Sequence, residues 1–195
     1  MLDIALATLA IAVLAAPMLL IALAIVIWDP GPVLFRQVRA GRRGQPFRIA
    51  KFRTMVVDAE KRLADDPVLL ASYLAGDNKL RPAQETRVTR IGRLLRATSL
   101  DELPQLFNVL AGSMSLVGPR PVLYSELRYY GTRTGRVLAV RPGITGPWQV
   151  SGRSSVGRAE RVEMDEAYAS WWSIAGDLSI LARTIVAVGR RDGAY

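Results

Sequence analysis

Cysteine and histidine are both absent from this chain. Their absence excludes disulfide bonds, thiolate nucleophiles, Ser–His catalytic triads and the usual zinc sites. Covalent catalysis would need a carboxylate, a hydroxyl or an amine, and a metal site would need oxygen ligands, which suits Mg²⁺. The chain also has no Walker-type and no G-x-G-x-x-G phosphate loop, so a nucleotide-hydrolysing fold is not expected.

Acidic residues are few compared with basic ones. The 195 residues include 17 Asp and Glu against 26 Lys and Arg, which gives a net charge of +9. A chain of this length predicts one domain, or one domain with an appendage. The positive charge predicts anionic partners, and phosphorylated substrates, anionic lipid headgroups and nucleic acid all satisfy it.

The segment from Ile4 to Trp28 contains no charged residue. About 20 such residues suffice to cross a bilayer as a helix. Pro17 interrupts the middle, where it leaves the carbonyl of Val13 without its helical partner and bends the axis. Two membrane arrangements follow: a kinked spanning helix, or a helix-break-helix hairpin that enters and leaves by the same face. The arginines that follow favour the cytoplasm, and the pattern alone favours spanning.

Two adjacent carboxylates, Asp101 and Glu102, form what we call the acid pair. Ser99 precedes Glu102 at capping-box spacing, so the pattern predicts the acid pair in the first turn of a helix. Two carboxylates among arginines can hold Mg²⁺ while the arginines hold phosphate oxygens. The plainer interpretation, favoured by spacing alone, is that the pair only caps the helix. Pro104 weakens it, because a proline inside a helix costs about 3 kcal/mol.

Two short β-prone segments, 33–37 and 47–53, flank a Gly/Arg-rich turn and predict a small hairpin. This hairpin would present Arg48, Lys51 and Arg53. At a period of two, Lys51 and Arg53 share one face. They form either a phosphate or lipid contact or a solvated basic edge that blunts strand pairing.

Most of the remaining chain is predicted to be helical, over residues 57–75, 87–97, 122–130, 160–173 and 178–188. The fold class is therefore mainly α with a small β-hairpin. In the helix over 87–97, the residues expected to face inward are Val88, Ile91, Leu94 and Leu95. Among its arginines, Arg96 is the closest to the acid pair and is the one expected to face it.

Two loops stiffened by prolines, 112–121 and 141–153, separate these helices. A rigid backbone around Arg120 suits bidentate capture of a phosphate. Trp148 by default packs against the core, although it could also stack on a base or lie at a membrane interface. The apolar C-terminal end, which includes Trp171, Trp172 and Ile185, predicts either core or an in-plane amphipathic helix.

Several motifs occur together in one order: the proline-broken apolar segment, Lys-Phe-Arg-Thr-Met55, Thr-Ser-Leu-Asp-Glu-Leu-Pro-Gln105, Leu-Val-Gly-Pro-Arg-Pro121 and Arg-Pro-Gly-Ile-Thr-Gly146. With them the chain closely resembles the bacterial sugar transferases, the monotopic phosphoglycosyl transferases that begin polysaccharide and glycoconjugate assembly. The resemblance covers essentially the whole chain, and the set of motifs is far more specific than any one of them.

The resemblance implies an enzyme that transfers a sugar-1-phosphate from a UDP-sugar to polyprenyl (undecaprenyl) phosphate and releases UMP. Asp101 matches the family's nucleophile, which forms a covalent phospho-sugar intermediate, and Glu102 matches its neighbour. Mg²⁺ is the expected cofactor, held at Asp101 and Glu102. The expected substrate-binding residues are Lys51, Arg53, Arg96 and Arg120, with Arg141 and Gln149 as weaker candidates for the nucleotide or the lipid phosphate.

The resemblance also implies a topology that overrules the spanning helix. Residues 1–31 become a re-entrant membrane hairpin with its break at Pro17, and residues 32–195 an α-rich catalytic domain with interfacial amphipathic helices. This domain would lie on the cytoplasmic face of the bacterial inner membrane. Expected partners are the UDP-sugar, polyprenyl phosphate and membrane lipid; no nucleic acid is expected, and a homo-oligomer is compatible with the sequence. The alternative function is a non-catalytic basic module that binds anionic lipid or nucleic acid.

Overall fold

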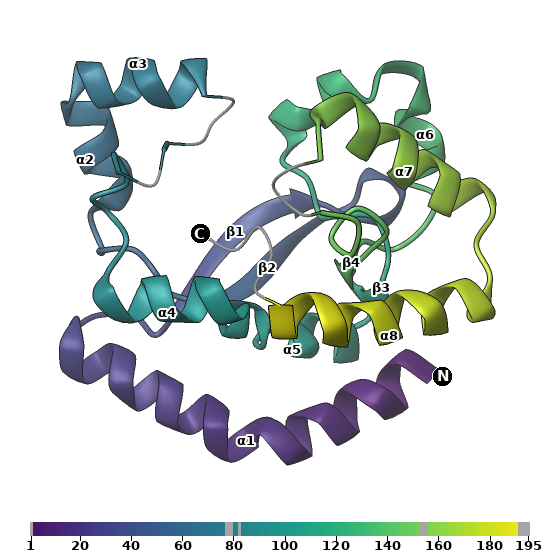
Figure 1. Cartoon of the computed structure of the whole chain (residues 1–195), viewed down its shortest axis with the longest axis horizontal. Coiled ribbons are helices and arrows are strands. Elements are labelled where there is room, and N and C mark those ends of the chain that lie inside the picture. Colours follow the sequence, from purple (N-terminus) through teal and green to yellow (C-terminus); the bar gives the residue numbers. More distant parts are fainter. Residues whose placement is uncertain (1, 77–79, 82, 153–155, 191–195) are drawn as a thin grey trace.

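A computed structural model describes residues 2–76, 80–81, 83–152 and 156–190 (Figure 1). Its helices are α1 (Leu2–Trp28), α2 (Ala59–Asp65), α3 (Pro67–Ala75), α4 (Arg90–Thr98), α5 (Gln105–Leu110), α6 (Thr134–Val137), α7 (Arg158–Ser170) and α8 (Ile174–Arg190). Its strands are β1 (Leu34–Ala40), β2 (Pro46–Phe52), β3 (Ser115–Val117) and β4 (Gly143–Thr145). The predicted class, mainly helical with a small hairpin and one long apolar N-terminal helix, is confirmed.

Helix α1 lies along one side of the rest of the chain and is bent, with its concave side toward it (Figure 1). Pro17 lies inside this helix. One stripe of α1 packs inward, with Ala7 and Ile25 fully buried in two separate core clusters. Other apolar residues of α1 stay exposed, among them Leu9, Val13, Leu19, Leu20 and Leu23. The helix is long and apolar enough to cross a membrane.

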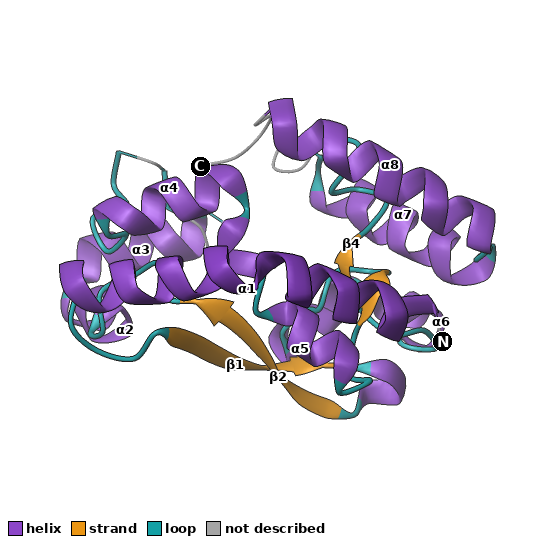
Figure 2. Ribbon diagram, turned by 90° about the horizontal axis from the view of Figure 1, so that it is seen from below, coloured by secondary structure: helices purple, strands orange, loops and turns teal. Residues whose placement is uncertain are grey.

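Both ends of α1 are tied to the same folded unit. Near its start, Asp3 accepts hydrogen bonds from the Ser115 hydroxyl at 2.8 Å and from the backbone N–H of Leu116 at 3.2 Å. Just after its end, Asp29 forms an ion pair with Arg53 at 2.7 Å. In the view from below, α1 crosses α4 and α5, with which it makes contact (Figure 2).

The predicted hairpin is confirmed. Strands β1 and β2 pair antiparallel, in a register that runs from Leu34 opposite Phe52 to Ala40 opposite Pro46. The turn between them places Arg43 and Gly44 at positive φ, 57° and 74°. Ile49 and Phe52 on β2 are buried, so this strand carries the hairpin's contacts to both clusters under α1.

The single helix predicted over 57–75 is wrong, because the chain forms α2 and α3 with a break at Asp66. Pro67 cannot donate a backbone hydrogen bond and disfavours helical geometry in the residue before it. The Asp66 carboxylate instead caps α3 by accepting from the N–H groups of Val68 and Leu69. The two helices project away from the rest of the chain (Figure 1).

Two predicted loops are partly strands. Segments within 112–121 and 141–153 pair as β3 and β4 in a parallel two-stranded sheet. Glycines make this approach close: a Cβ on Gly143 would lie 2.1 Å from the nitrogen of Gly118. The helix predicted over 122–130 is a 3₁₀ segment, Tyr124–Tyr129, while α7 and α8 lie close to their predicted ranges.

Candidate active site

The acid pair lies in a short 3₁₀ turn, Leu100–Glu102, between α4 and α5. The predicted place in a first turn after Ser99 is confirmed for this 3₁₀ turn, but the predicted capping box is wrong. Ser99 adopts the left-handed conformation (φ 58°) that ends α4, and its side chain makes no capping hydrogen bond. Pro104 is also not inside a helix: it occupies the N-cap of α5, where the missing N–H removes no helical bond.

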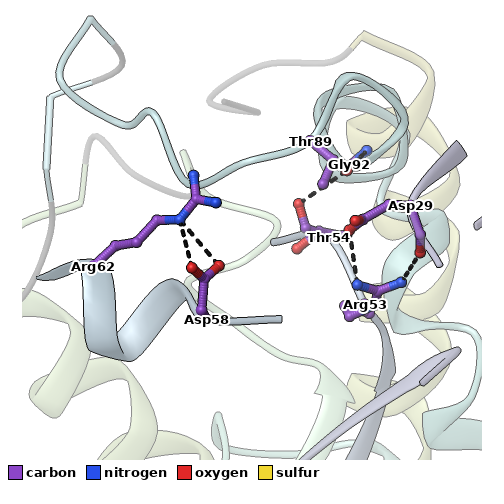
Figure 3. Close-up of polar contacts among 7 residues, drawn as sticks. All are labelled: Asp29, Arg53, Thr54, Asp58, Arg62, Thr89 and Gly92. Carbon is purple, nitrogen blue, oxygen red and sulfur yellow. Dashed lines mark hydrogen bonds and ion pairs between the residues drawn. The ribbon is translucent and has the colours of Figure 1, made fainter. Parts of the chain in front are cut away.

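Helix α4 approaches the acid pair because its start is pressed against the chain that follows β2. Thr89 caps α4 through the backbone N–H of Gly92 at 2.9 Å. A Cβ on Gly92 would lie 2.0 Å from the carbonyl oxygen of Thr54, so only glycine allows this contact (Figure 3). Leu95 is buried as predicted, whereas Leu94 is 59% exposed and the inward orientation predicted for it is wrong.

Asp101 is a largely desolvated carboxyl surrounded by charged groups. Burial raises its pKa from the ordinary 3.8 to about 6; the positive charges of Lys51 and Arg96 oppose the rise, and Glu102 adds to it. At neutral pH the group is mainly ionised yet poorly hydrated. A carboxylate in this state is a candidate nucleophile.

Strand β2 brings Lys51 to the acid pair. The Lys51 ammonium lies 2.5 Å from a carboxylate oxygen of Glu102. The Asn108 side chain on α5 fastens the strand by accepting from the N–H of Ala50 and donating to the carbonyl of Arg48, both at 2.9 Å. Sequence reasoning did not identify Asn108, although it lies six residues after Glu102.

Arg96 faces the acid pair from α4, as predicted. Its Nε donates to the Thr54 hydroxyl at 2.9 Å. Burial lowers the pKa of this guanidinium, and the charge of Asp101 opposes the change. Arg96 therefore interacts electrostatically with the candidate nucleophile.

Arg53 pairs with Asp29, whereas Lys51 pairs with Glu102. Its guanidinium donates to the Asp29 carboxylate and to the Asp29 backbone carbonyl (Figure 3). Only 6% of the Arg53 side chain is exposed. Strand β2 ends at Phe52, so the two-residue alternation that placed Arg53 beside Lys51 does not continue to it. Arg53 therefore ties the end of α1 to the hairpin.

A cleft of about 1200 Å³ joins these groups. All the predicted site residues line it except Arg141, which is exposed on the segment before β4; the lining ones are Lys51, Arg53, Arg96, Asp101, Glu102, Arg120 and Gln149. The cleft also contains arginines that were not predicted as site residues: Arg36, Arg39, Arg87 and Arg93. Its basic lining fits a phosphorylated ligand.

The profile of the family described as bacterial sugar transferase matches residues 1–191 of this chain. The chain belongs to the bacterial sugar transferase family. A UDP-galactose-lipid carrier transferase of Erwinia amylovora is 44% identical over 191 residues, which cover 96% of this chain and 39% of the relative. An undecaprenyl-phosphate galactose phosphotransferase of Salmonella typhimurium is 44% identical over 189 residues, covering 95% and 39%. A UDP-glucose:undecaprenyl-phosphate glucose-1-phosphate transferase of Caulobacter vibrioides is 44% identical over 202 residues, covering 100% and 70%.

This chain thus spans 39% of the length of the first two relatives. Within its cleft, Trp148 confirms the default prediction, since it is 6% exposed and packed. The guanidinium groups of Arg120 and Arg161 lie 5.7 Å and 4.6 Å from its ring centroid. The side-chain oxygen of Gln149 is buried and has no hydrogen-bond partner among the described residues.

The oxygen ligands at the cleft can be compared with those that a metal ion needs. Among the described residues, no group of three or more acidic side chains is placed to hold a metal ion. The acid pair offers two carboxylates at the cleft. Mg²⁺ is commonly held by one or two carboxylates, substrate phosphates and water, so Asp101 and Glu102 fit an ion that is completed by a bound diphosphate.

Proposed function

We propose that this sugar transferase moves a sugar-1-phosphate from a UDP-sugar to polyprenyl phosphate and releases UMP, through an aspartyl phospho-sugar intermediate at Asp101. The observation that carries the proposal is the raised pKa and charged surroundings of Asp101 in a basic cleft. The names of the Salmonella and Caulobacter relatives support the acceptor and the type of group transferred. In a non-catalytic basic module, this desolvated carboxylate would have no function.

In the first step, a carboxylate oxygen of Asp101 attacks the β-phosphorus of the UDP-sugar. The bond from this phosphorus to the bridging oxygen breaks, and UMP leaves with that oxygen. In the second step, an oxygen of polyprenyl phosphate attacks the same phosphorus and releases the Asp101 carboxylate. Two steps let a soluble donor and a membrane-bound acceptor use one site in turn.

The residues of the cleft stabilise the charge that these steps develop. Lys51 and Arg96 act next to the nucleophile, and Arg120 lies on the cleft wall. We call Arg120 the phosphate clamp, because a guanidinium can bind phosphate oxygens in a bidentate way. Mg²⁺ bound at Asp101 and Glu102 would supply further neutralisation of the diphosphate.

The proposed position of the protein on the membrane rests on how α1 is attached and on what it exposes. Its two ends are tied to the same folded unit through Asp3 and Asp29, and its outer face is apolar and exposed. This supports a re-entrant helix with both ends on the cytoplasmic side of the bacterial inner membrane, where the basic residues after α1 also belong.

Helices α4, α5 and α8 lie at one level above α1 (Figure 1). They expose large apolar side chains, namely Leu94, Phe107, Leu178 and Ile185, and the segment between α7 and α8 exposes Trp171 and Trp172. Exposed tryptophans and aliphatic residues of this kind are typical of a membrane interface. This layer would hold the cleft at the level of the lipid phosphate.

The proposal is tested by mixing the protein, polyprenyl phosphate and Mg²⁺ with a panel of UDP-sugars and measuring UMP. Asp101→Asn should abolish UMP release, and Glu163→Gln, at an exposed acid on α7, should preserve it. With donor alone, the intact protein should gain the mass of one phospho-sugar on Asp101. Product formation without an adduct at Asp101 would refute the covalent route.

A further inference from the structure

A second carboxyl is buried away from the acid pair. Asp165 on α7 is fully buried, with 0% of its surface exposed. The Tyr130 hydroxyl donates to one of its oxygens at 2.9 Å. The other oxygen is buried next to the backbone of Arg120 but makes no hydrogen bond of standard geometry with any described residue. Because burying an incompletely partnered carboxyl is costly, a role in addition to packing is expected.

The surroundings of Asp165 connect it to the phosphate clamp. Tyr130 and Arg120 line one small cavity of about 70 Å³ between α7 and the cleft, together with Trp148, Arg161 and Val162. Burial raises the pKa of Asp165 to about 7. The Tyr130 hydrogen bond, the Arg120 charge and backbone, and then the Arg161 charge oppose this rise, in that order. Arg120 therefore acts on Asp165 more strongly than Arg161 does.

The backbone on either side of Arg120 is already fastened. The carbonyl of Pro119 accepts from the N–H of Gly143 at 2.8 Å, and the carbonyl of Pro121 accepts from the Arg39 guanidinium at 3.2 Å. The Arg120 side chain itself is exposed, lies over Trp148, and makes no ion pair in the described part of the chain. Its orientation thus depends on the aromatic ring and on the nearby negative charge.

We propose that Asp165 is a positioning residue: together with Tyr130, it holds the Arg120 guanidinium at the cleft wall, where it binds the donor's diphosphate. The proposal rests on the function proposed above, because Arg120 is the phosphate clamp only in that reaction. Asp165 does not touch the substrate and acts through Arg120. If its role were purely structural, its loss would act independently of Arg120.

The test is a double-mutant cycle on steady-state UMP release, measured with saturating polyprenyl phosphate and varied UDP-sugar. Asp165→Asn keeps the shape of the side chain and removes its charge. We expect a KM for the UDP-sugar raised about tenfold with kcat nearly unchanged, the size typical of coupled neighbours. In the Arg120→Ala background, the same substitution should have no further effect. Tyr130→Phe should also raise KM for the UDP-sugar, and this effect should likewise disappear in the Arg120→Ala background. Tyr130→Phe replaces Asp165→Asn in the cycle if Asp165→Asn does not fold.

Two outcomes would overturn the proposal. One is an unchanged KM in Asp165→Asn; the other is a KM that Asp165→Asn raises tenfold both in the wild type and in the Arg120→Ala background. Glu163→Gln, an exposed acid on the same helix, is the matched control and should follow the wild type. Failure of the reaction itself is a separate result: in that case the wild type releases no UMP with any donor.

A pH profile adds a readout that a folding defect would not reproduce. The titratable and charged groups that act on Asp165 are Tyr130, which stays neutral, Arg120 and Arg161. Glu126 and Arg158 also line the adjoining cavity. Since its pKa is raised to about 7, Asp165 loses its charge, and its hold on Arg120, as the pH falls from 8 to 6. KM for the donor should rise over this range in the wild type and stay flat in Asp165→Asn. A flat wild-type profile contradicts the proposal.

Discussion

Replacing Asp101 by asparagine should abolish turnover and at the same time stabilise the folded protein. Burial raises the pKa of this carboxyl from 3.8 to about 6. A carboxyl whose pKa is raised on folding contributes stability that is fully present below pH 3.8 and is lost as the pH rises through 6. Asparagine resembles the protonated acid and carries no charge to lose.

The magnitude follows from the shift. At about 1.36 kcal/mol for each pKa unit, ionisation of Asp101 at pH 8 costs the folded state about 3 kcal/mol. Asp101→Asn should gain that amount at pH 8 and about 1 kcal/mol at pH 4.5. For a chain of this size, the gain at pH 8 corresponds to a rise in Tm of roughly 6–12 °C.

The assay is thermal unfolding in detergent, followed by tryptophan fluorescence, with EDTA present so that no divalent ion stabilises the carboxylate. Asp58→Asn is the control, because Asp58 is exposed and a hydrogen bond from Arg62 lowers its pKa. That variant should gain nothing at pH 8. The reasoning fails if Asp101→Asn lowers Tm at pH 8, or if its gain is equal at both pH values, since the effect would then not come from charge.

Three further predictions follow from other features. UMP release with saturating donor alone should fall as the pH drops through about 6, because protonation removes the Asp101 nucleophile; a rate constant that stays level down to pH 5 would count against it. Gly92→Ala should lower the free energy of unfolding, measured by chemical denaturation, by about 2 kcal/mol or more, because its Cβ would meet the Thr54 carbonyl. Gly135→Ala on α6 is the control: a Cβ there meets open space, so the variant should be neutral or stabilising in the same measurement. Cysteines introduced at exposed Leu2 and Arg43 should both react with an impermeant thiol reagent only from the cytoplasmic side, and labelling from opposite sides would identify a spanning helix.

Local patterns predicted the elements whose cause is local. The β-prone segments and the Gly/Arg-rich turn predicted the hairpin because turn chemistry and side-chain alternation act over a few residues. The uncharged run predicted α1 because the length and apolar composition of one continuous segment suffice to indicate such a helix. Local patterns also misled: the Ser99–Glu102 spacing resembles a capping box, yet the chain there ends α4 and reaches Pro104 before the next helix begins.

By itself, the sequence determined that covalent chemistry must rest on a carboxylate, a hydroxyl or an amine, because cysteine and histidine are absent. It also determined the family, through motifs that the profile match confirms. Only the tertiary structure separated the two cations of the hairpin: it brings Lys51 to the acid pair and engages Arg53 with Asp29. The reason is that burial and contacts between distant segments set a side chain's partners and its pKa, and neither can be read from neighbours in the chain.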